Sequence, residues 1–191
     1  AIVGGMGFVL LVSQAVLTRR VMSDSVQRVS TQVAARTVQH VRVAMGVLGV
    51  ASIGQLLEHT AVAADVPFYQ ALGRPLVMVL TDTDWGYLWL GRVGVLGLMA
   101  AVLSLPRAPQ QPADEGRGAW FRSILWATVL GGVLLLTFSL VSHGAATPEI
   151  RAAAVCADYL HLLAVAFWGG GLCHLALSLS QELWREPAEV R

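Results

Sequence analysis

Residues 142–177 read SHGAATPEIRAAAVCADYLHLLAVAFWGGGLCHLAL, and this stretch decides the fold. It begins where one apolar run ends, passes through a short polar turn and continues as a second run that is apolar enough to cross a bilayer. His143 lies in the turn, and Asp158, His161 and His174 lie inside the second run. Ionisable groups within such a segment are costly in lipid and by default indicate a functional site. The stretch therefore predicts membrane-spanning helices, and it holds three of the five histidines.

The composition supports the same fold class. Of the 191 residues, 55% are hydrophobic and only 13% are charged, whereas a soluble domain carries roughly 25% charged residues. Alternating strand patterns are absent from the sequence, which excludes a membrane barrel. The formal net charge of +1 gives no support for a nucleic-acid partner. We predict an all-α, polytopic transmembrane helix bundle, a single domain over residues 1–191 whose partner is the lipid bilayer.

The apolar runs predict about five spanning helices. Their expected ranges are 1–17, 40–57, 85–105, 119–141 and 148–183. Residues 21–39 are more polar and predict an amphipathic surface helix or an extension of the next helix. A short surface or re-entrant helix is expected around 75–80, and Trp85, Tyr87 and Trp89 resemble an interfacial aromatic belt. The chain starts without Met inside an apolar run, so we expect its natural N-terminus to lie upstream or to have been removed.

Arginine bias sets the orientation of these helices. Arginines are concentrated in the first and third connections and in the tail, whereas the second and fourth connections hold one each. Because positive residues favour the cytoplasmic side, we expect the N-terminus outside and the C-terminus inside.

This topology sorts the histidines into two layers. The outer layer holds His59, His143 and His161, with Asp158 one turn from His161; the inner layer holds His40 and His174. Imidazoles from three helices predict a copper or zinc site, in which a carboxylate orients its neighbouring histidine. The alternative for each histidine is a polar residue at the membrane interface or a hydrogen bond between helices. The three glycines at 169–171 predict a close helix contact.

The two cysteines, Cys156 and Cys173, are 17 residues apart. On one continuous helix they would be separated by roughly 25 Å, which excludes a disulfide between them.

The order of several residues resembles the copper-resistance protein D (CopD) family of bacterial membrane proteins. The matching residues are Ser142, His143, Gly144, Ala145, Asp158, His161, Trp168, Gly169 and Gly170, together with Thr83, Gly86, Trp89 and Arg92. The resemblance implies about eight helices, so we expect the chain to be an N-terminal five-helix portion of a longer chain, with a shortened relative or a subunit as alternatives. The resemblance implies copper handling at or across the bacterial inner (plasma) membrane by a multi-pass protein, with His143, Asp158, His161 and Trp168 carried over as functional positions.

Three hypotheses follow. The first is a membrane copper-handling protein whose outer site holds copper, with a periplasmic copper carrier as a possible partner. The second is an electron-transfer protein that binds haem b through paired histidines, although the angle between His161 and His174 around one helix disfavours a shared partner helix. The third is an accessory or structural subunit that contacts other membrane subunits. No hydrolytic triad, phosphate-binding loop or CxxC motif is present, so we do not expect an enzyme.

Overall fold

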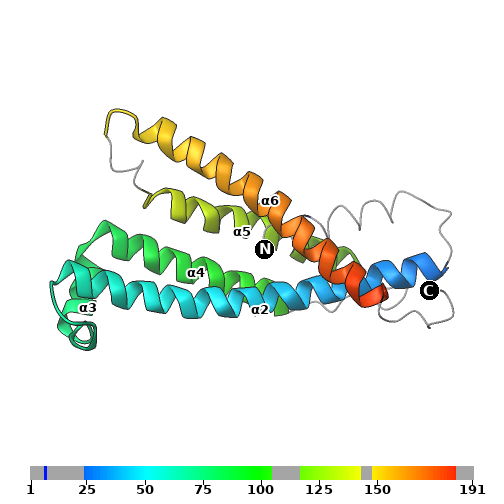
Figure 1. Ribbon diagram of the computed structural model, residues 1–191, viewed down its shortest axis with the longest axis horizontal. Helices are drawn as coiled ribbons and strands as arrows, with labels where there is room; N and C mark the ends of the chain where they lie inside the picture. The colour runs from blue at the N-terminus through cyan, green and yellow to red at the C-terminus, as the bar shows by residue number, and fades with distance from the viewer. Residues whose placement is uncertain (1–6, 8–23, 105–116, 143–147, 184–191) are drawn as a thin grey trace.

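The computed structural model describes Gly7 and residues 24–104, 117–142 and 148–183. In these residues the chain forms only helices (Figure 1). They are α2 (Asp24–Ala63), the 3-10 helix η1 (Phe68–Gln70), α3 (Arg74–Asp82), α4 (Asp84–Ser104), α5 (Arg117–Ser139) and α6 (Arg151–Leu183). Four segments are long and apolar enough to cross a membrane: Ala35–Ala63, Asp84–Ser104, Gly118–Ser139 and Arg151–Cys173. The predicted all-α transmembrane fold class is therefore confirmed. Apart from Gly7, the helix expected over residues 1–17 lies outside the described residues.

Helix α2 decides between the two alternatives for the polar residues before its apolar run. It is continuous from Asp24 to Ala63, so residues 24–39 extend the spanning helix and do not form a separate surface helix. Neither Gly nor Pro occurs between residues 24 and 45, so the sequence contains no residue there that breaks a helix. The helix ends where Asp65 adopts a left-handed conformation with φ of 51°. The amide of Val66 donates to the carbonyl of Ala61 at 3.0 Å, which satisfies one carbonyl of the last turn.

Helix α3 forms in the connection where a short helix was expected, and a tight corner joins it to α4. Thr83 caps α4: its hydroxyl oxygen accepts a hydrogen bond from the amide of Gly86 at 3.0 Å and donates to the carbonyl of Val79 at 2.6 Å. A Cβ atom on Gly86 would collide with the Val79 carbonyl oxygen and would lie 2.7 Å from the Cα of Leu80. Only glycine lets α3 approach α4 this closely.

Helix α4 packs antiparallel to α2 on one side and to α5 on the other. Arg42 on α2 donates to the carbonyl of Leu103 on α4, close to one end of the bundle. Farther along, the indole N–H of Trp89 donates to the carbonyl of Ser52 at 3.0 Å. At the other end, His59 stacks on Trp85. We call this second end, which also holds α3, the α3 end.

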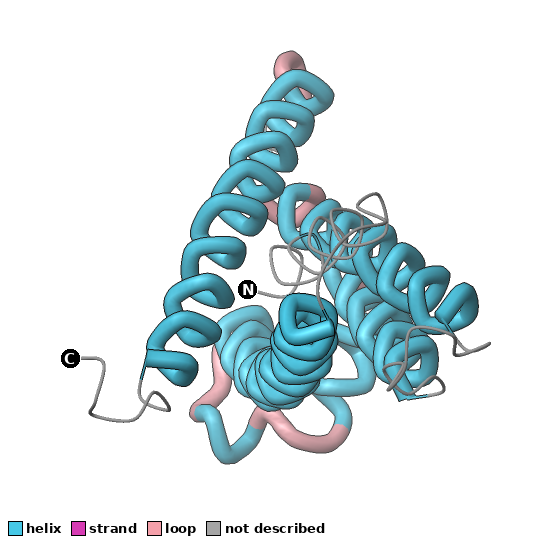
Figure 2. The backbone as a smooth tube through the Cα atoms, turned by 90° about the vertical axis from the view of Figure 1, so that its right-hand side faces the viewer, coloured by secondary structure: helices cyan, strands magenta, loops and turns pink. Residues whose placement is uncertain are grey.

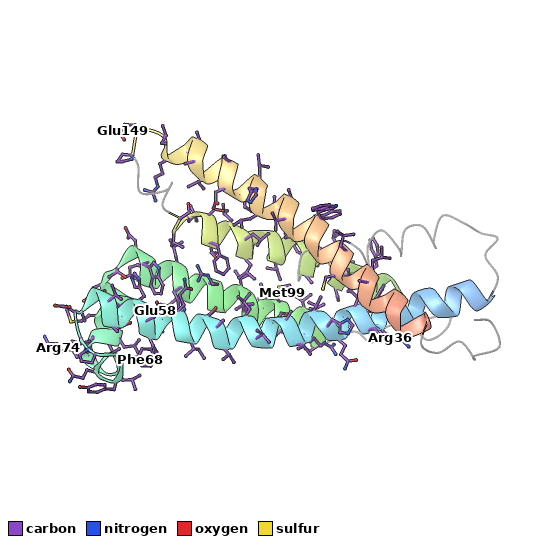
Figure 3. All side chains as sticks on the ribbon, in the orientation of Figure 1. Arg36, Glu58, Phe68, Arg74, Met99 and Glu149 are labelled. Carbon is purple, nitrogen blue, oxygen red and sulfur yellow. The ribbon has the colours of Figure 1, made fainter. Side chains whose placement is uncertain are left out.

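The apolar core lies between α2, α4 and α5. Its buried residues are Val38, Val41, Met45, Met99, Leu103, Trp120, Ile124 and Ala127. Met99 on α4, labelled in Figure 3, is fully buried. Trp89 is only 9% exposed and belongs to a second cluster with Leu56 and Val79. The expectation of an interfacial belt is therefore wrong for Trp89, because its ring fills the interior and its N–H bonds the backbone of α2.

Helix α6 starts at the side of the molecule where α3 lies and leans away from α2 and α4 over its N-terminal half (Figures 1 and 2). Much of its apolar surface is uncovered: Leu160 is 64% exposed and Trp168 is 76% exposed. Gly7 is buried and helical, and a Cβ atom on it would lie 2.6 Å from the ring of Phe167, so this residue packs against α6. Within the glycine run, Gly170 is buried, whereas no described atom lies within 4 Å of a Cβ position at Gly169 or Gly171. The close contact predicted for the run is therefore not seen among the described residues at Gly169 and Gly171.

Candidate functional site

His59 is the best-positioned candidate ligand at the α3 end. Its ring is half-buried and stacks on Trp85, with the ring centroids 3.8 Å apart and an angle of 12° between the planes. Trp85 is in the first turn of α4, two residues after the Thr83 cap. Stacking uses the face of the imidazole and leaves both ring nitrogens at its edge. The Trp85 ring therefore orients His59 without occupying the atoms that bind a metal.

The second group of candidate ligands is on α6. Asp158 is half-buried and His161 is exposed, and they are three residues apart on the same helix, so they share one face. Cys156, two residues before Asp158, is an exposed free thiol. These residues lie in the first third of α6, the part that begins at the α3 side in Figure 1. The structure thus places His59 and the Asp158–His161 pair toward the same end of the molecule, on helices that do not pack along their length there.

The candidates of the predicted inner layer are distributed toward the opposite end. His40 is half-buried on α2, near Arg42 and its bond to the end of α4. Cys173 is an exposed free thiol on α6, and His174 follows it in the same helix. Because α6 is continuous from Arg151 to Leu183, the two cysteines are far apart on one helix, and both are free as expected.

His143 lies outside the described residues. Within the described part of the chain, no three His, Cys, Asp or Glu side chains come together as a metal site. His59 is on α2 and His161 is on α6. The predicted three-histidine site remains a prediction.

A polar cluster in the interior was not predicted. Arg92, in the middle of α4, is 1% exposed. Its Nη1 donates to Oε1 of Gln55 on α2 at 2.9 Å, and its Nε donates to Oγ1 of Thr137 on α5 at 3.2 Å. The guanidinium also lies 3.8 Å from the centroid of the Phe138 ring. One side chain thus links three membrane-spanning helices.

One feature of the sequence weakly indicates the Arg92 cluster. A single arginine interrupts an otherwise apolar span, and such a residue normally faces the interior of a helix bundle. Its partners Gln55 and Thr137 are 37 and 45 residues away along the chain. They are uncharged and belong to no metal-ligand pattern, so the sequence alone does not indicate their role.

The packed helices, their apolar outer surfaces and this polar interior define a multi-pass helical membrane protein. Comparison with known proteins gives a narrower class. The chain belongs to the family described as copper resistance protein D-like, N-terminal domain, whose family model matches residues 1–153. It is also similar to the copper transport protein CutJ of Bacillus subtilis (strain 168), with 28% identity over 159 residues that cover 83% of this chain. The chain spans only 28% of the length of CutJ. No solved structure matches it.

The family predicted from the sequence is confirmed, but the matched residues differ from those expected. The resemblance was placed mainly in the second half of the chain, whereas the family match runs from residue 1 to residue 153. It includes Thr83, Gly86 and Arg92, which the structure places in a helix cap, a helix contact and the interior. Asp158 and His161 lie beyond the matched residues.

Proposed function

We propose that this protein handles copper as its cargo, by a role other than catalysis, and that copper is captured at the α3 end. His59 and His161 are the proposed ligands, with His143 as a third. Asp158 is proposed to fix the orientation of the His161 ring through a hydrogen bond, as carboxylates do for metal-binding histidines.

The observation that carries this proposal is the position of the candidate ligands. In a chain of a copper resistance family, His59 is on α2, which packs against α4, and no described residue forms a hydrogen bond with its ring nitrogens. His161 is exposed on α6. Imidazole nitrogens are good ligands for copper. A metal bound by both would link α6 to the bundle. His40 and His174, with Cys173, are proposed as the next position for copper at the opposite end.

Arginine bias gives the expected orientation of the protein in the membrane. The α3 end is expected to face the outside, so copper would be captured there. This end also carries exposed acidic residues, with Glu58 on α2 and Glu149 just before α6 (Figure 3). Exposed carboxylates raise the local concentration of cations and increase their rate of association.

The test is copper binding by the purified full chain in detergent, measured by competition with a chromogenic Cu(I) chelator. We expect His59→Ala and His161→Ala each to weaken binding at least about tenfold, and Asp158→Asn to weaken it about 10–100-fold. Gln70→Ala, an exposed residue at the same end, is the matched control and should bind like the parent chain.

Two results would contradict the proposal. One is a parent chain that binds no copper. The other is copper binding that survives both histidine substitutions unchanged. An absorption spectrum of the same sample distinguishes the haem hypothesis, because a Soret band without copper indicates haem b.

A further inference from the structure

Arg92 carries a buried positive charge without an opposite charge beside it. Its hydrogen bonds go to neutral acceptors: the amide oxygen of Gln55 and the hydroxyl and carbonyl oxygens of Thr137, the last at 3.4 Å. Within the described part of the chain, no carboxylate forms an ion pair with it. Because a guanidinium stays protonated in proteins, this positive charge is permanent.

Burial makes this charge effective over a distance. Arg92 is 1% exposed, so little water screens it, and interactions at low effective dielectric constant are several times stronger than in water. The acidic residues that flank the proposed site, Glu58 on α2 and Asp84 on α4, are exposed, so solvent and salt weaken their fields. The interior at this depth is therefore electropositive.

The charge lies just beneath the proposed copper ligand. Gln55, which accepts the bond from Arg92, is four residues before His59 on α2, so the two share one face and are roughly 6 Å apart along the axis. On α4, Arg92 is seven residues after Trp85, which stacks on His59. These offsets are roughly 6 Å along α2 and about 10 Å along α4, so a metal held by His59 would be on the order of 8 Å from the guanidinium.

We infer that Arg92 makes the site at His59 selective for monovalent copper, Cu(I), over divalent ions. This inference rests on the proposed function. The repulsion from a fixed charge is proportional to the charge of the metal. At about 8 Å and an effective dielectric constant of about 20, this repulsion lowers the affinity for a monovalent ion about 30-fold and the affinity for a divalent ion about 1,000-fold. The arginine therefore favours Cu(I) by about 30-fold.

Two substitutions neutralise this charge in different ways. Arg92→Gln removes it, and Gln55→Glu places a carboxylate at the hydrogen-bonding position of Arg92 while keeping the arginine. Binding of Cu(I), under reducing conditions, and of Zn(II) is measured by chelator competition on the full chain in detergent. The affinity for each metal is compared between the variant and the parent chain, so the intrinsic preference of that metal for its ligands cancels. In both variants the affinity for Zn(II) relative to Cu(I) should rise about 30-fold.

The controls separate charge from structure. Arg92→Lys keeps the charge and should leave the ratio within about threefold of the parent value, since a lysine ammonium carries the same unit charge. Arg74→Gln removes an exposed arginine on α3 and should not change the ratio. Helicity measured by circular dichroism confirms that each variant folds, and Gln55→Glu decides the question if Arg92→Gln does not fold.

Two outcomes overturn the inference. In the first, Cu(I) binding still depends on His59, but the two neutralising variants change the affinities for Cu(I) and Zn(II) equally or not at all. Arg92 then does not select by charge, although the proposed function stands. If the parent chain shows no His59-dependent copper binding, both the inference and the proposed function are wrong.

Discussion

The corner between α3 and α4 gives the sharpest stability prediction. In Gly86→Ala, the new methyl group would lie 2.7 Å from the Cα of Leu80, whereas ordinary contact begins at 3.4 Å. The backbone of α3 must therefore move by at least about 0.7 Å, and it must also clear the Val79 carbonyl oxygen. Overpacking costs about 1–3 kcal/mol. We expect a value of about 3 kcal/mol, because both colliding groups belong to the backbone and neither can rotate away.

Gly91→Ala is the matched control for this prediction. Gly91 is on the same helix, and no described atom lies within 4 Å of its Cβ position. Replacing glycine by alanine raises helix propensity by about 1 kcal/mol at both positions. The difference in unfolding free energy between the two variants therefore measures the cost of the steric collision at position 86. Reversible unfolding in mixed detergent micelles, followed by circular dichroism, should show Gly86→Ala less stable than Gly91→Ala by about 3 kcal/mol. Equal stabilities would refute the packing described for this corner.

Three further predictions concern the cap, the core and the orientation. Thr83→Val removes the cap of α4 and should lower the unfolding free energy by about 1 kcal/mol in the same assay; an unchanged value would argue against capping. Trp89→Phe removes the indole donor to the carbonyl of Ser52, which keeps its bond within α2, and should cost about 0.5–1.5 kcal/mol, whereas an interfacial tryptophan would tolerate the change. In a cysteine-free chain in intact cells, a membrane-impermeant maleimide should label Glu58→Cys from outside and leave Arg36→Cys unlabelled; the reverse pattern would invert the predicted orientation.

The spanning helices were predictable because lipid leaves the backbone few choices. An apolar run of about 20 residues must satisfy its own amides and carbonyls, so it forms a helix wherever it crosses a bilayer. The expected helix at 85–105 was found as Asp84–Ser104, and the one at 119–141 as Arg117–Ser139. The N-terminal part of α2 was harder to assign, since outside the membrane a polar stretch has other ways to satisfy its backbone.

The candidate site was only partly predictable. Counting residues along helices is enough to assign His59 and His161 to one depth and His40 to another. It does not show which way each helix leans, and the divergence of α6 from the bundle separates residues of equal depth. The roles of Trp89 and Arg92 depend on partners on other helices, Ser52 and Thr137 among them, and those pairings exist only after the chain has folded.

The arginine in the middle of α4 also affects the order in which the protein enters its membrane. An isolated helix with a central arginine is penalised by about 2.5–3.5 kcal/mol during insertion. Gln55 is synthesised 37 residues before Arg92, whereas Thr137 is synthesised 45 residues after it. The hydrogen-bond acceptor on α2 is therefore already present when α4 leaves the ribosome, whereas the acceptor on α5 has not yet been synthesised. We expect α4 to move into the lipid already paired with α2, and α5 to complete the enclosure of the arginine afterwards.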